Sequence, residues 1–364
     1  MTNKKTVAVM TSYYINNYGS VLQALATKDF LSSLGFRVVF INYIRENVRS
    51  RIVINEKWNS NVVKRLIYKL YKTIDKKSKD KVFKKFVNNH LELTRPFETK
   101  ESLYNMPIEA DVFCVGSDQM WNSEYNGGVI GENFLDFVPS GRIKISLATS
   151  MGMASYSDEE LKQMSGLLED YSFISVREKE AVDILTAAGV KNVYQMLDPT
   201  LLLSGERWKS LCSKHPSGRD YVLIYQLNDN PKMQEFAKRL AAEGELEVKQ
   251  ITYYMSQHWA GIKSIYDPPI EQFISLIADA KYVVTDSFHG TAFSINLNKD
   301  FYAFKPAKYA GRIISVLSLT GLSERLVEDI DQYDSPDKIN YAPVNTILDR
   351  YRSEARELVM DALK

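Results

Sequence analysis

YVVTDSFHGT, residues 282–291, is the stretch of sequence that decides the fold of this chain. Tyr282–Thr285 is a short aromatic and β-branched run, which is typical of a buried strand. Asp286 and Ser287 are residue types that cap the N-termini of helices, and a helix is expected from about Gly290. A strand that leads directly into a helix is the building unit of a parallel sheet, so the stretch predicts an α/β fold.

The same unit recurs on both sides of this stretch. The period of the apolar residues predicts strands at 6–11, 37–42, 112–116, 143–149 and 173–176, and again at 221–227, 248–254 and 301–305. Helices are predicted at 21–34, 157 onward, 178–188, 231–243, 270–280 and 344–363. The fold class is therefore α/β, with parallel sheets that helices cover on both faces.

The alternation of strand and helix pauses near Val193–Asp198, and a stretch with Ser, Gly and Pro follows as far as Arg219. At 364 residues two domains are the default, so this stretch is interpreted as the junction between two Rossmann-like lobes that face a cleft. We expect an N-terminal lobe at 1–195 with a basic helical insert at 45–90, a C-terminal lobe at 196–343, and a helix at 344–364 that completes the first lobe. Ligands bind at the carboxyl ends of strands in such sheets, so candidate chemistry is sought there.

Positive charge is concentrated in one segment of the chain. The net charge is +1, yet Arg45–His90 contains 14 Lys and Arg against 4 Asp and Glu, a balance of +10 that leaves −9 for the rest. This asymmetry predicts a local anionic partner and argues against a nucleic-acid-binding protein, because the remainder would repel phosphates. Residues 62–74 of the segment carry an apolar and a basic helical face, which fits either contact with an anionic membrane or a helix that covers the core.

Cysteine and histidine usage argues against a metal site. The 2 cysteines and 4 histidines are scattered, without the spacing of a disulfide framework or a zinc site, so we expect no metal and a reducing, cytoplasmic location. No apolar run approaches the ~18 residues that a membrane-spanning helix needs. The first residues also lack the pattern of a signal peptide, so a soluble protein is expected.

The strongest candidate site is the turn at residues 285–291. Backbone N–H groups at such a helix start, with the Ser287 and Thr291 hydroxyls and the Gly290 backbone beside them, favour a bound phosphate or carboxylate. His289 is placed to exchange a proton near neutral pH. The alternative interpretation is a simple helix cap with a packed histidine.

Two further strand ends carry groups suited to a sugar. After the first strand, Asn17 and Tyr18, with Gln23 one turn later, offer amides and a phenol to sugar hydroxyls, although an ordinary turn explains the same residues. The pattern is not GxGxxG, so a dinucleotide is disfavoured. After the third strand, Asp118 is a candidate base, and the neighbouring amides and indole are candidates for sugar contacts, namely Gln119, Trp121 and Asn122.

Cationic side chains at other strand ends are candidates for holding an anion. Arg177 ends a strand, and its planar guanidinium can grip a carboxylate or a phosphate, although an ion pair with Glu178 or Asp170 is an equal alternative. Lys305, Lys308 and Arg312 follow the strand after His289. Groups from both lobes are therefore predicted to surround one anion.

Seven segments, taken in order, resemble the polysaccharide pyruvyl transferase family: NNYGSVLQALA, VGSDQMWN, SLATSMG, ISVRE, LDPTLLL, VVTDSFHGTAFSI and KYAGRI. The likeness runs from about Val9 to Arg312, and the GSDQxW-like and SDSxHG-like pieces are the most specific. The chain departs from the family pattern at two places: Glu178 stands where the family often has Asp, and the N-terminal lobe has a long basic insert. The identity of the acceptor sugar is therefore not predicted.

The resemblance implies a glycosyltransferase-B-like fold and an enzyme that uses phosphoenolpyruvate and a sugar of a lipid-linked or cell-surface glycan, such as an exopolysaccharide or a capsule. It implies that Arg177 binds the donor and that His289 lies in the phosphate-binding turn of the C-terminal, donor-binding lobe. No cofactor is expected beyond phosphoenolpyruvate as co-substrate, and the enzyme is expected in the cytoplasm at the inner face of the membrane. A nucleotide-sugar glycosyltransferase of the same architecture, or a glycan-binding relative without activity, are the alternatives.

Overall fold

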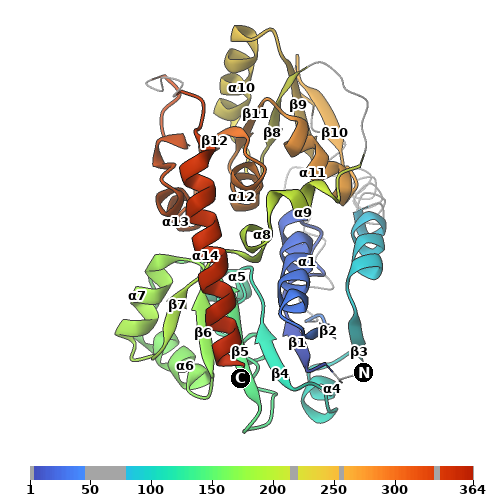
Figure 1. The fold of residues 1–364 in the computed structure, drawn as a ribbon, viewed down its shortest axis with the longest axis vertical. Coiled ribbons are helices and arrows are strands. Elements are labelled where there is room, and N and C mark those ends of the chain that lie inside the picture. Colours follow the sequence, from blue (N-terminus) through green and yellow to red (C-terminus); the bar gives the residue numbers. More distant parts are fainter. Residues whose placement is uncertain (1–3, 46–78, 214–219, 254–257, 332–336, 364) are drawn as a thin grey trace, which may run out of the picture.

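A computed structural model of the chain describes residues 4–45, 79–213, 220–253, 258–331 and 337–363. Two parallel sheets, each flanked by helices, form an elongated molecule of two lobes (Figure 1). The amphipathic helix predicted at 62–74 and most of the basic insert lie outside the described residues, and the described end of that insert, residues 79–90, is helical.

The first sheet contains seven parallel strands in the order β3-β2-β1-β4-β5-β6-β7. Buried Val, Ile, Ala and Phe residues dominate its central strands, as expected for strands covered on both faces. Their bounds are β1 Thr6–Met10, β2 Arg37–Tyr43, β3 Leu93–Phe97, β4 Val112–Val115, β5 Ile143–Thr149, β6 Phe173–Val176 and β7 Val193–Gln195.

The second sheet contains six parallel strands in the order β10-β9-β8-β11-β12-β13, which is again the Rossmann order. Their bounds are β8 Tyr221–Tyr225, β9 Glu247–Thr252, β10 Lys263–Tyr266, β11 Tyr282–Thr285, β12 Asp300–Phe304 and β13 Leu326–Val327. The α/β class and the two Rossmann-like lobes predicted from the sequence are confirmed. Strands β3, β7, β10 and β13 are absent from the sequence prediction.

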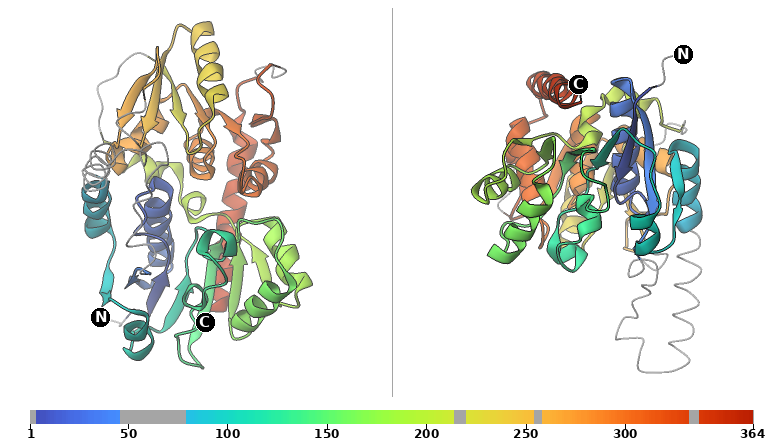
Figure 2. Two further views of the ribbon diagram at one scale, coloured as in Figure 1. Left: turned by 180° about the vertical axis from the view of Figure 1, so that it is seen from behind. Right: turned by 90° about the horizontal axis from the view of Figure 1, so that it is seen from below.

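Helices flank both sheets, as the views from behind and from below show (Figure 2). Those of the first half are α1 Tyr18–Ser33, α4 Lys100–Asn105, α5 Ser123–Asn126, the 3₁₀ helix η2 Gly131–Phe134, α6 Asp158–Leu168, α7 Lys179–Ala187, α8 Pro199–Leu202 and α9 Gly205–Lys209. Those of the second half are α10 Pro231–Glu243, α11 Ile270–Asp279, α12 Phe288–Asn296, α13 Gly311–Thr320, the 3₁₀ helix η3 Ser323–Arg325 and α14 Tyr341–Ala362. The sequence predicts a loop after Asp198, but this stretch begins with the two short helices α8 and α9. Asp198 caps the first helix and Ser204 caps the second.

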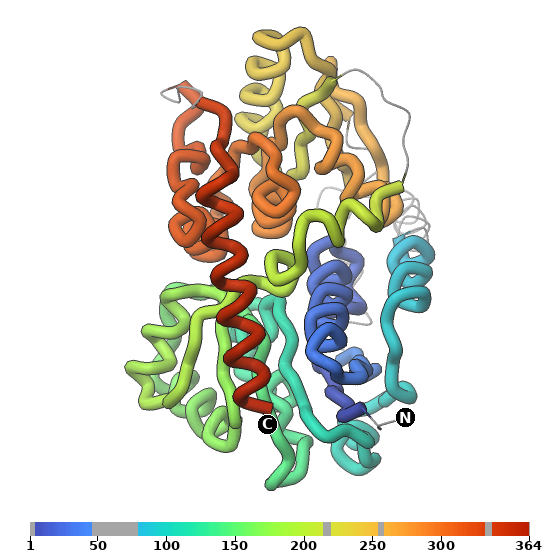
Figure 3. The backbone as a smooth tube through the Cα atoms, in the orientation of Figure 1, coloured from blue at the N-terminus to red at the C-terminus, as the bar shows by residue number. Residues whose placement is uncertain are grey.

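Helix α14 connects the two lobes, and the tube drawing shows it running alongside both, in front of the other segments (Figure 3). Arg352 donates hydrogen bonds to the carbonyl oxygens of Leu201 and Leu203 and to Asn296 Oδ1 of the second lobe. At the other end of the helix, Leu363 O accepts a hydrogen bond from Lys5 Nζ beside β1. Helix α14 therefore contacts both lobes. The residue limits of the two domains stay a prediction.

The strand order fixes where a ligand site lies. In the first sheet the order reverses between β1 and β4, and in the second between β8 and β11. In open parallel sheets the crevice at the carboxyl ends of such a strand pair is the binding position. The turns after these four strands carry Asn17, Asp118, Asn228 and His289, so both crevices contribute to one interlobe region. Among the described helices, none is both long and apolar enough to cross a membrane.

Candidate active site between the two lobes

His289 lies at the start of α12, directly after strand β11. Ser287 caps this helix, and its side chain accepts a hydrogen bond from the Gly290 backbone N–H at 3.3 Å. The imidazole is 6% exposed. The turn predicted from the sequence therefore has the expected local structure, with the histidine held at a helix N-terminus.

A second helix N-terminus meets His289 from the opposite lobe. Asn17 caps α1, and its side chain accepts a hydrogen bond from the Ser20 N–H at 3.3 Å. A Cβ atom added to Gly19 would lie 1.9 Å from His289 Nδ1, so the imidazole packs directly on the helix backbone at a place that only glycine allows. The N-termini of α1 and α12 therefore converge on one histidine, and both favour negative charge.

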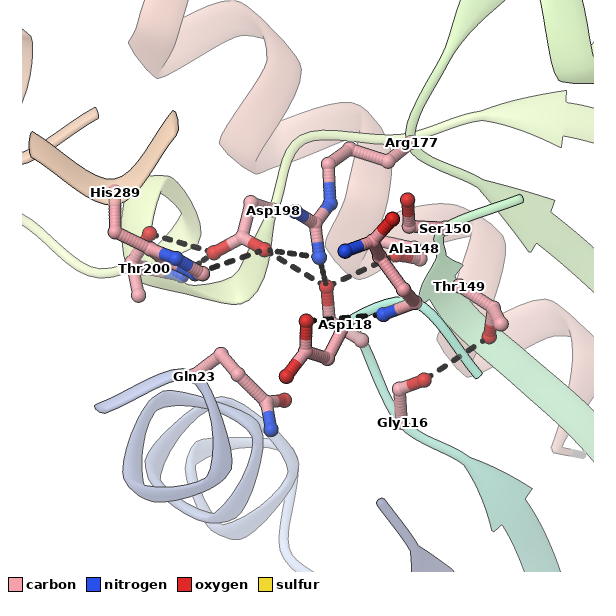
Figure 4. A network of polar contacts seen from close by, with 12 residues as sticks. Gln23, Gly116, Asp118, Ala148, Thr149, Ser150, Arg177, Asp198, Thr200 and His289 are labelled. Carbon is pink, nitrogen blue, oxygen red and sulfur yellow. Dashed lines mark hydrogen bonds and ion pairs between the residues drawn. The ribbon is translucent and has the colours of Figure 1, made fainter. Parts of the chain in front are cut away.

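Asp198 lies on the other side of the imidazole, in a buried polar network that links both lobes (Figure 4). Its Oδ2 atom is 3.0 Å from Arg177 Nη2 and 4.0 Å from His289 Nε2, and it accepts a hydrogen bond from Ser117 at 2.7 Å. Its Oδ1 atom accepts from the backbone N–H and the hydroxyl of Thr200. Every acceptor position of this carboxylate is thus used by a donor or faces the histidine.

The pKa shifts follow from this burial and charge. Burial lowers the pKa of His289 to about 4, although Asp198 acts in the opposite direction, so the imidazole is neutral at pH 7. Burial alone raises the pKa of Asp198, but Arg177, His289 and the two hydroxyls outweigh it, and the net direction is downward. Burial and the nearby charge of Arg177 lower the pKa of Arg312.

Several buried donors in this network lack an acceptor. Within the described part of the chain, no hydrogen-bond partner faces Arg177 Nε and Nη1, His289 Nε2 or Arg312 Nε. Buried donors without acceptors are unfavourable by about 1–3 kcal/mol each. Two guanidinium groups with free N–H groups therefore lie near an imidazole nitrogen without a partner, and such an arrangement favours an anion.

A cavity of about 500 Å³ opens beside these donors between the lobes. This volume is in the range of small-molecule sites. The first lobe contributes Asn17, Ser20, Asp118, Gln119 and Tyr125, and the second contributes Asn228, Asp286, Ser287, His289, Lys308, Tyr309 and Arg312. Residues predicted at separate strand ends, including Asp118, Ser287, His289 and Arg312, are therefore brought together in one cavity.

Asp118 lies in the turn after β4, at the carboxyl end of the first sheet. Its backbone has a φ of 82°, in the left-handed region that is unfavourable for most residues. Its Oδ2 accepts a hydrogen bond from the Ser20 hydroxyl at 2.6 Å, and its Oδ1 accepts from the Gln119 N–H at 2.9 Å. The Asp118 side chain lines the cavity from the first lobe, and Ser287 and His289 at the N-terminus of α12 line it from the second.

Four of the residues predicted as sugar contacts do not line the cavity, because their side chains are used inside the fold. The Trp121 ring is 1% exposed, stacks on Phe134 at 5.1 Å and donates to Asn133 O. Tyr18 stacks on Phe273 at 4.3 Å and donates to Pro268 O, which holds the two lobes together. Gln23 donates to Thr11 Oγ1 and Ser20 O, and Asn122 caps α5. Asn17 and Gln119 line the cavity, so their role as contacts stays a prediction.

The predicted donor-binding residues divide in the same way. Thr291 is buried and donates to Ser287 O, and a side chain at Gly290 would collide with Thr285 Oγ1 at 2.2 Å, so these two positions serve the packing of the turn. Lys305 is exposed and does not line the cavity, so its role in donor binding stays a prediction. Lys308 forms an ion pair with Glu124 of the first lobe and borders the cavity.

Arg177 is 5% exposed and does not line the 500 Å³ cavity. Neither of the two ion-pair partners considered in the sequence is correct, since Arg177 pairs with Asp198, whereas Asp170 pairs with Lys144 and Glu178 accepts from Met151 N. Its guanidinium stacks on the Phe288 ring at 4.5 Å. Only its Nη2 atom is used in the pair with Asp198, so Nε and Nη1 stay without a partner among the described residues.

Asp198 and Ser117 are site residues that the sequence analysis missed. The Asp-Pro after β7 was a usable signal, because a carboxylate at the carboxyl end of a parallel strand lies at the ligand crevice. It was interpreted as the start of a linker. Across the described ranges, no group of three or more His, Cys, Asp and Glu side chains is arranged to hold a metal.

Comparison with protein families gives one match, to the family described as polysaccharide pyruvyl transferase, over residues 17–307. No curated protein sequence matches the chain. The matched range includes Asn17, Asp118, Arg177, Asp198 and His289 and ends before Arg312.

Solved structures with the same fold are distant in sequence. A structure of Arabidopsis thaliana UGT89C1 complexed with UDP-L-rhamnose aligns with a TM-score of 0.53 and 9% identity, covering 100% of both chains. A candidate UDP-N-acetylglucosamine 2-epimerase from Listeria monocytogenes aligns with a TM-score of 0.51 and 10% identity, covering 98% of this chain and 97% of the other. At such identities the likeness concerns the fold alone, and it confirms the predicted glycosyltransferase-B-type architecture.

Proposed function

This chain belongs to the polysaccharide pyruvyl transferase family, and from that premise we propose that it transfers the pyruvyl group of phosphoenolpyruvate to two hydroxyls of one sugar, forming a ketal and releasing phosphate. The observation that carries the proposal is the set of buried nitrogen atoms without hydrogen-bond partners on His289 and Arg312, which line a cavity that two helix N-termini face. Phosphoenolpyruvate carries a phosphate and a carboxylate, and such a site favours both.

In the proposed binding mode, the donor's phosphate lies at the start of α12. Ser287, His289 and Arg312 are at this end of the cavity, and Lys308 borders it. The carboxylate of the donor faces the start of α1, where Asn17 and Ser20 line the same cavity. Arg177 does not line this cavity and acts by fixing Asp198 through Nη2.

The proposed reaction begins with protonation of the donor's methylene carbon. Burial lowers the pKa of His289 and favours the neutral imidazole, but a phosphate dianion beside it would raise the pKa and favour the imidazolium form. Asp198, 4.0 Å from Nε2, stabilises that cation. Transfer of the proton to the methylene carbon makes C2 electrophilic, and His289 returns to the neutral form.

Two sugar hydroxyls then form the ketal. The first attacks C2 while Asp118 accepts its proton, which forms one C–O bond and leaves the phosphate attached. The second hydroxyl attacks the same carbon, the bond from C2 to the phosphate oxygen breaks, and the phosphate leaves with the second proton. Asp118 lines the cavity from the first lobe, so the acceptor is proposed to approach from that side.

We also propose that the acceptor sugar belongs to a lipid-linked or cell-surface glycan, such as an exopolysaccharide or a capsule. This part rests on the family alone. It motivates the proposal that the chain works in the cytoplasm at the inner face of the membrane, with the basic segment near Arg45–His90 in peripheral contact with anionic lipid.

The test is a phosphate-release assay on the purified protein with phosphoenolpyruvate and a panel of methyl glycosides and disaccharides of common hexoses and N-acetylhexosamines. The expected result is phosphate release that depends on the acceptor, with a pyruvyl-ketal product in the mass spectrum. A parallel panel of UDP-sugars without phosphoenolpyruvate separates the glycosyltransferase alternative. Product formation from UDP-sugars only, or glycan binding with no product from either donor, would overturn the proposal.

A further inference from the structure

The cavity of about 500 Å³ in which the donor is proposed to bind is called the donor cavity. A second interlobe cavity, of about 490 Å³, lies beside it. Its first-lobe wall consists of residues 152–155, between β5 and α6, and the start of α7 with Glu178 and Glu180. Its second-lobe wall is residues 308–312 together with Ile314. The two cavities share Lys308, Tyr309 and Arg312, so they lie on either side of one short segment.

The charges of the second cavity differ from those of the donor cavity. Glu124, Glu178 and Glu180 line it, against Lys308 and Arg312, and Lys308 is already paired with Glu124. Helix α7 does begin here, but Glu178 occupies its N-cap position and Glu180 its first turn, so negative charge is already in place. A phosphate or a second carboxylate would be repelled, whereas carboxylate oxygens accept hydrogen bonds from hydroxyl groups.

The shape of the wall also suits a sugar ring. Tyr309 lies at the border of both cavities, and its backbone has a φ of 60°, a conformation that is unfavourable for a bulky residue and that concentrates at functional sites. Gly152, with a φ of 70°, keeps the opposite loop tight against the first lobe, because a Cβ there would meet Gln119 Oε1 at 2.6 Å. An aromatic side chain, a loop of small and apolar residues and nearby carboxylates together offer an apolar surface and hydrogen-bond acceptors to a sugar ring.

Resting on the proposed function, we propose that the second cavity binds the sugar next to the one that is pyruvylated. The reacting sugar lies in the donor cavity near Asp118, and its neighbour passes the 308–312 segment into the second cavity, where Glu180 and Tyr309 contact it. The enzyme is then specific for an oligosaccharide chain rather than for a single sugar, and any lipid or phosphate of the acceptor lies beyond this acidic cavity.

The test compares two acceptors that share the same reacting sugar: the methyl monosaccharide that accepts pyruvate in the panel above, and the disaccharide that carries it at the same end. The wild type is expected to show a kcat/KM about tenfold higher for the disaccharide, which corresponds to roughly 1.4 kcal/mol of added binding. Glu180→Gln and the cavity-filling Ala154→Trp are expected to reduce this ratio to near one, with an unchanged KM for phosphoenolpyruvate.

Glu159→Gln is the matched control, because Glu159 is exposed in α6 and lines neither cavity. It is expected to keep the full ratio. A wild-type ratio near one, or a ratio that survives both Glu180→Gln and Ala154→Trp, would overturn the second-sugar site while the pyruvyl transfer stands. If no acceptor releases phosphate from phosphoenolpyruvate, the proposed function itself fails, so the two failures are distinct.

Discussion

Asp198 Oδ2 lies 4.0 Å from His289 Nε2, so a carboxylate at the end of the first lobe faces a histidine at the helix start of the second. The carboxylate is held by Arg177 and Ser117 on one side and by Thr200 on the other. Because these partners are all buried, the position of Asp198 is fixed before any ligand binds. The interaction couples the spatial relation of the two lobes to the protonation of His289.

Asp198→Asn is expected to lower both stability and turnover. Loss of the charge leaves Arg177 buried without a counter-ion, and breaking such a pair lowers the free energy of unfolding by about 3–5 kcal/mol. Because Asp198 raises the pKa of His289, the alkaline limb of the kcat profile should move to lower pH in the variant. Urea denaturation and a pH–rate profile measure the two effects.

The control for this change is Asp183→Asn, which removes an exposed pair with Lys179 on α7. A change of less than about 1 kcal/mol is expected there. An Asp198→Asn enzyme that is destabilised but keeps the wild-type pH profile would show that the residue only supports the fold.

His289→Ala is expected to reduce kcat by roughly 10²–10⁴, the usual contribution of a positioned proton donor. The residue lines the donor cavity and has no acceptor for Nε2 among the described residues, so its removal takes away a proton donor more than a structural contact. Single-turnover kinetics with saturating phosphoenolpyruvate isolate the chemical step. Near-normal rates in the variant would exclude His289 as the acid.

The free energy of unfolding is expected to fall as the pH drops from about 6.5 to about 4. Burial lowers the pKa of His289 from 6.5 to about 4, so over this range the unfolded chain binds a proton that the folded protein does not. Asp198, whose pKa is lowered from 3.8, contributes only at lower pH. Urea titrations at several pH values measure the slope, and His289→Gln should flatten it. An equal slope in both proteins would assign it to other groups.

The fold could be predicted from the sequence because its evidence is local. Short apolar strands followed by helix caps, as at Tyr282–Ser287, specify parallel sheets wherever they occur. Strands β3 and β13 were missed for the opposite reason. Leu93–Phe97 contains Arg and Pro and is largely uncovered, and Leu326–Val327 has two residues, so neither shows an apolar period. Their pairing with a neighbouring strand, which is not visible in the sequence, makes them strands.

The sequence indicates the candidate residues that depend on backbone geometry, and it does not show which side chains are buried. Ser287 and His289 lie at a helix start that the local pattern indicates. Trp121 has the composition of a sugar contact, yet its ring is covered by Phe134, and only the three-dimensional packing decides between these two uses. Asp198 was overlooked because its partners, Arg177 and Ser117, are distant in the chain.

Arg312→Gln is expected to weaken phosphoenolpyruvate binding by at least tenfold, since a charge-assisted hydrogen bond to a buried anion contributes about 1.5–3 kcal/mol. Arg312 lines the donor cavity, and its Nε has no acceptor in the described part of the chain. Calorimetric titration with phosphoenolpyruvate gives the Kd. Arg142→Gln, an exposed position that lines neither cavity, is the control for the loss of one positive charge. Equal affinities in the two variants would remove Arg312 from the donor site.

Gly19→Ala is expected to damage activity although it improves the helix. Alanine in place of glycine favours a helix by about 0.8–1.0 kcal/mol in an interior position. At Gly19, however, the new methyl would lie 1.9 Å from His289 Nδ1, so the imidazole or the whole lobe must move. A displacement of about 1 Å at a reacting group reduces turnover by roughly 10². Measuring kcat together with the Kd for phosphoenolpyruvate shows whether chemistry or binding is affected.

Gly166→Ala provides the matched control, because Gly166 lies within α6 and a Cβ there would have no neighbour within 4 Å among the described residues. This variant should gain stability and keep full activity, so the same chemical change is tested with and without the contact to His289. If Gly19→Ala also keeps full activity, the two lobes can separate at α1 without disturbing the histidine. The close packing of α1 on His289 would then not contribute to catalysis, and the donor site would need only the C-terminal lobe's groups.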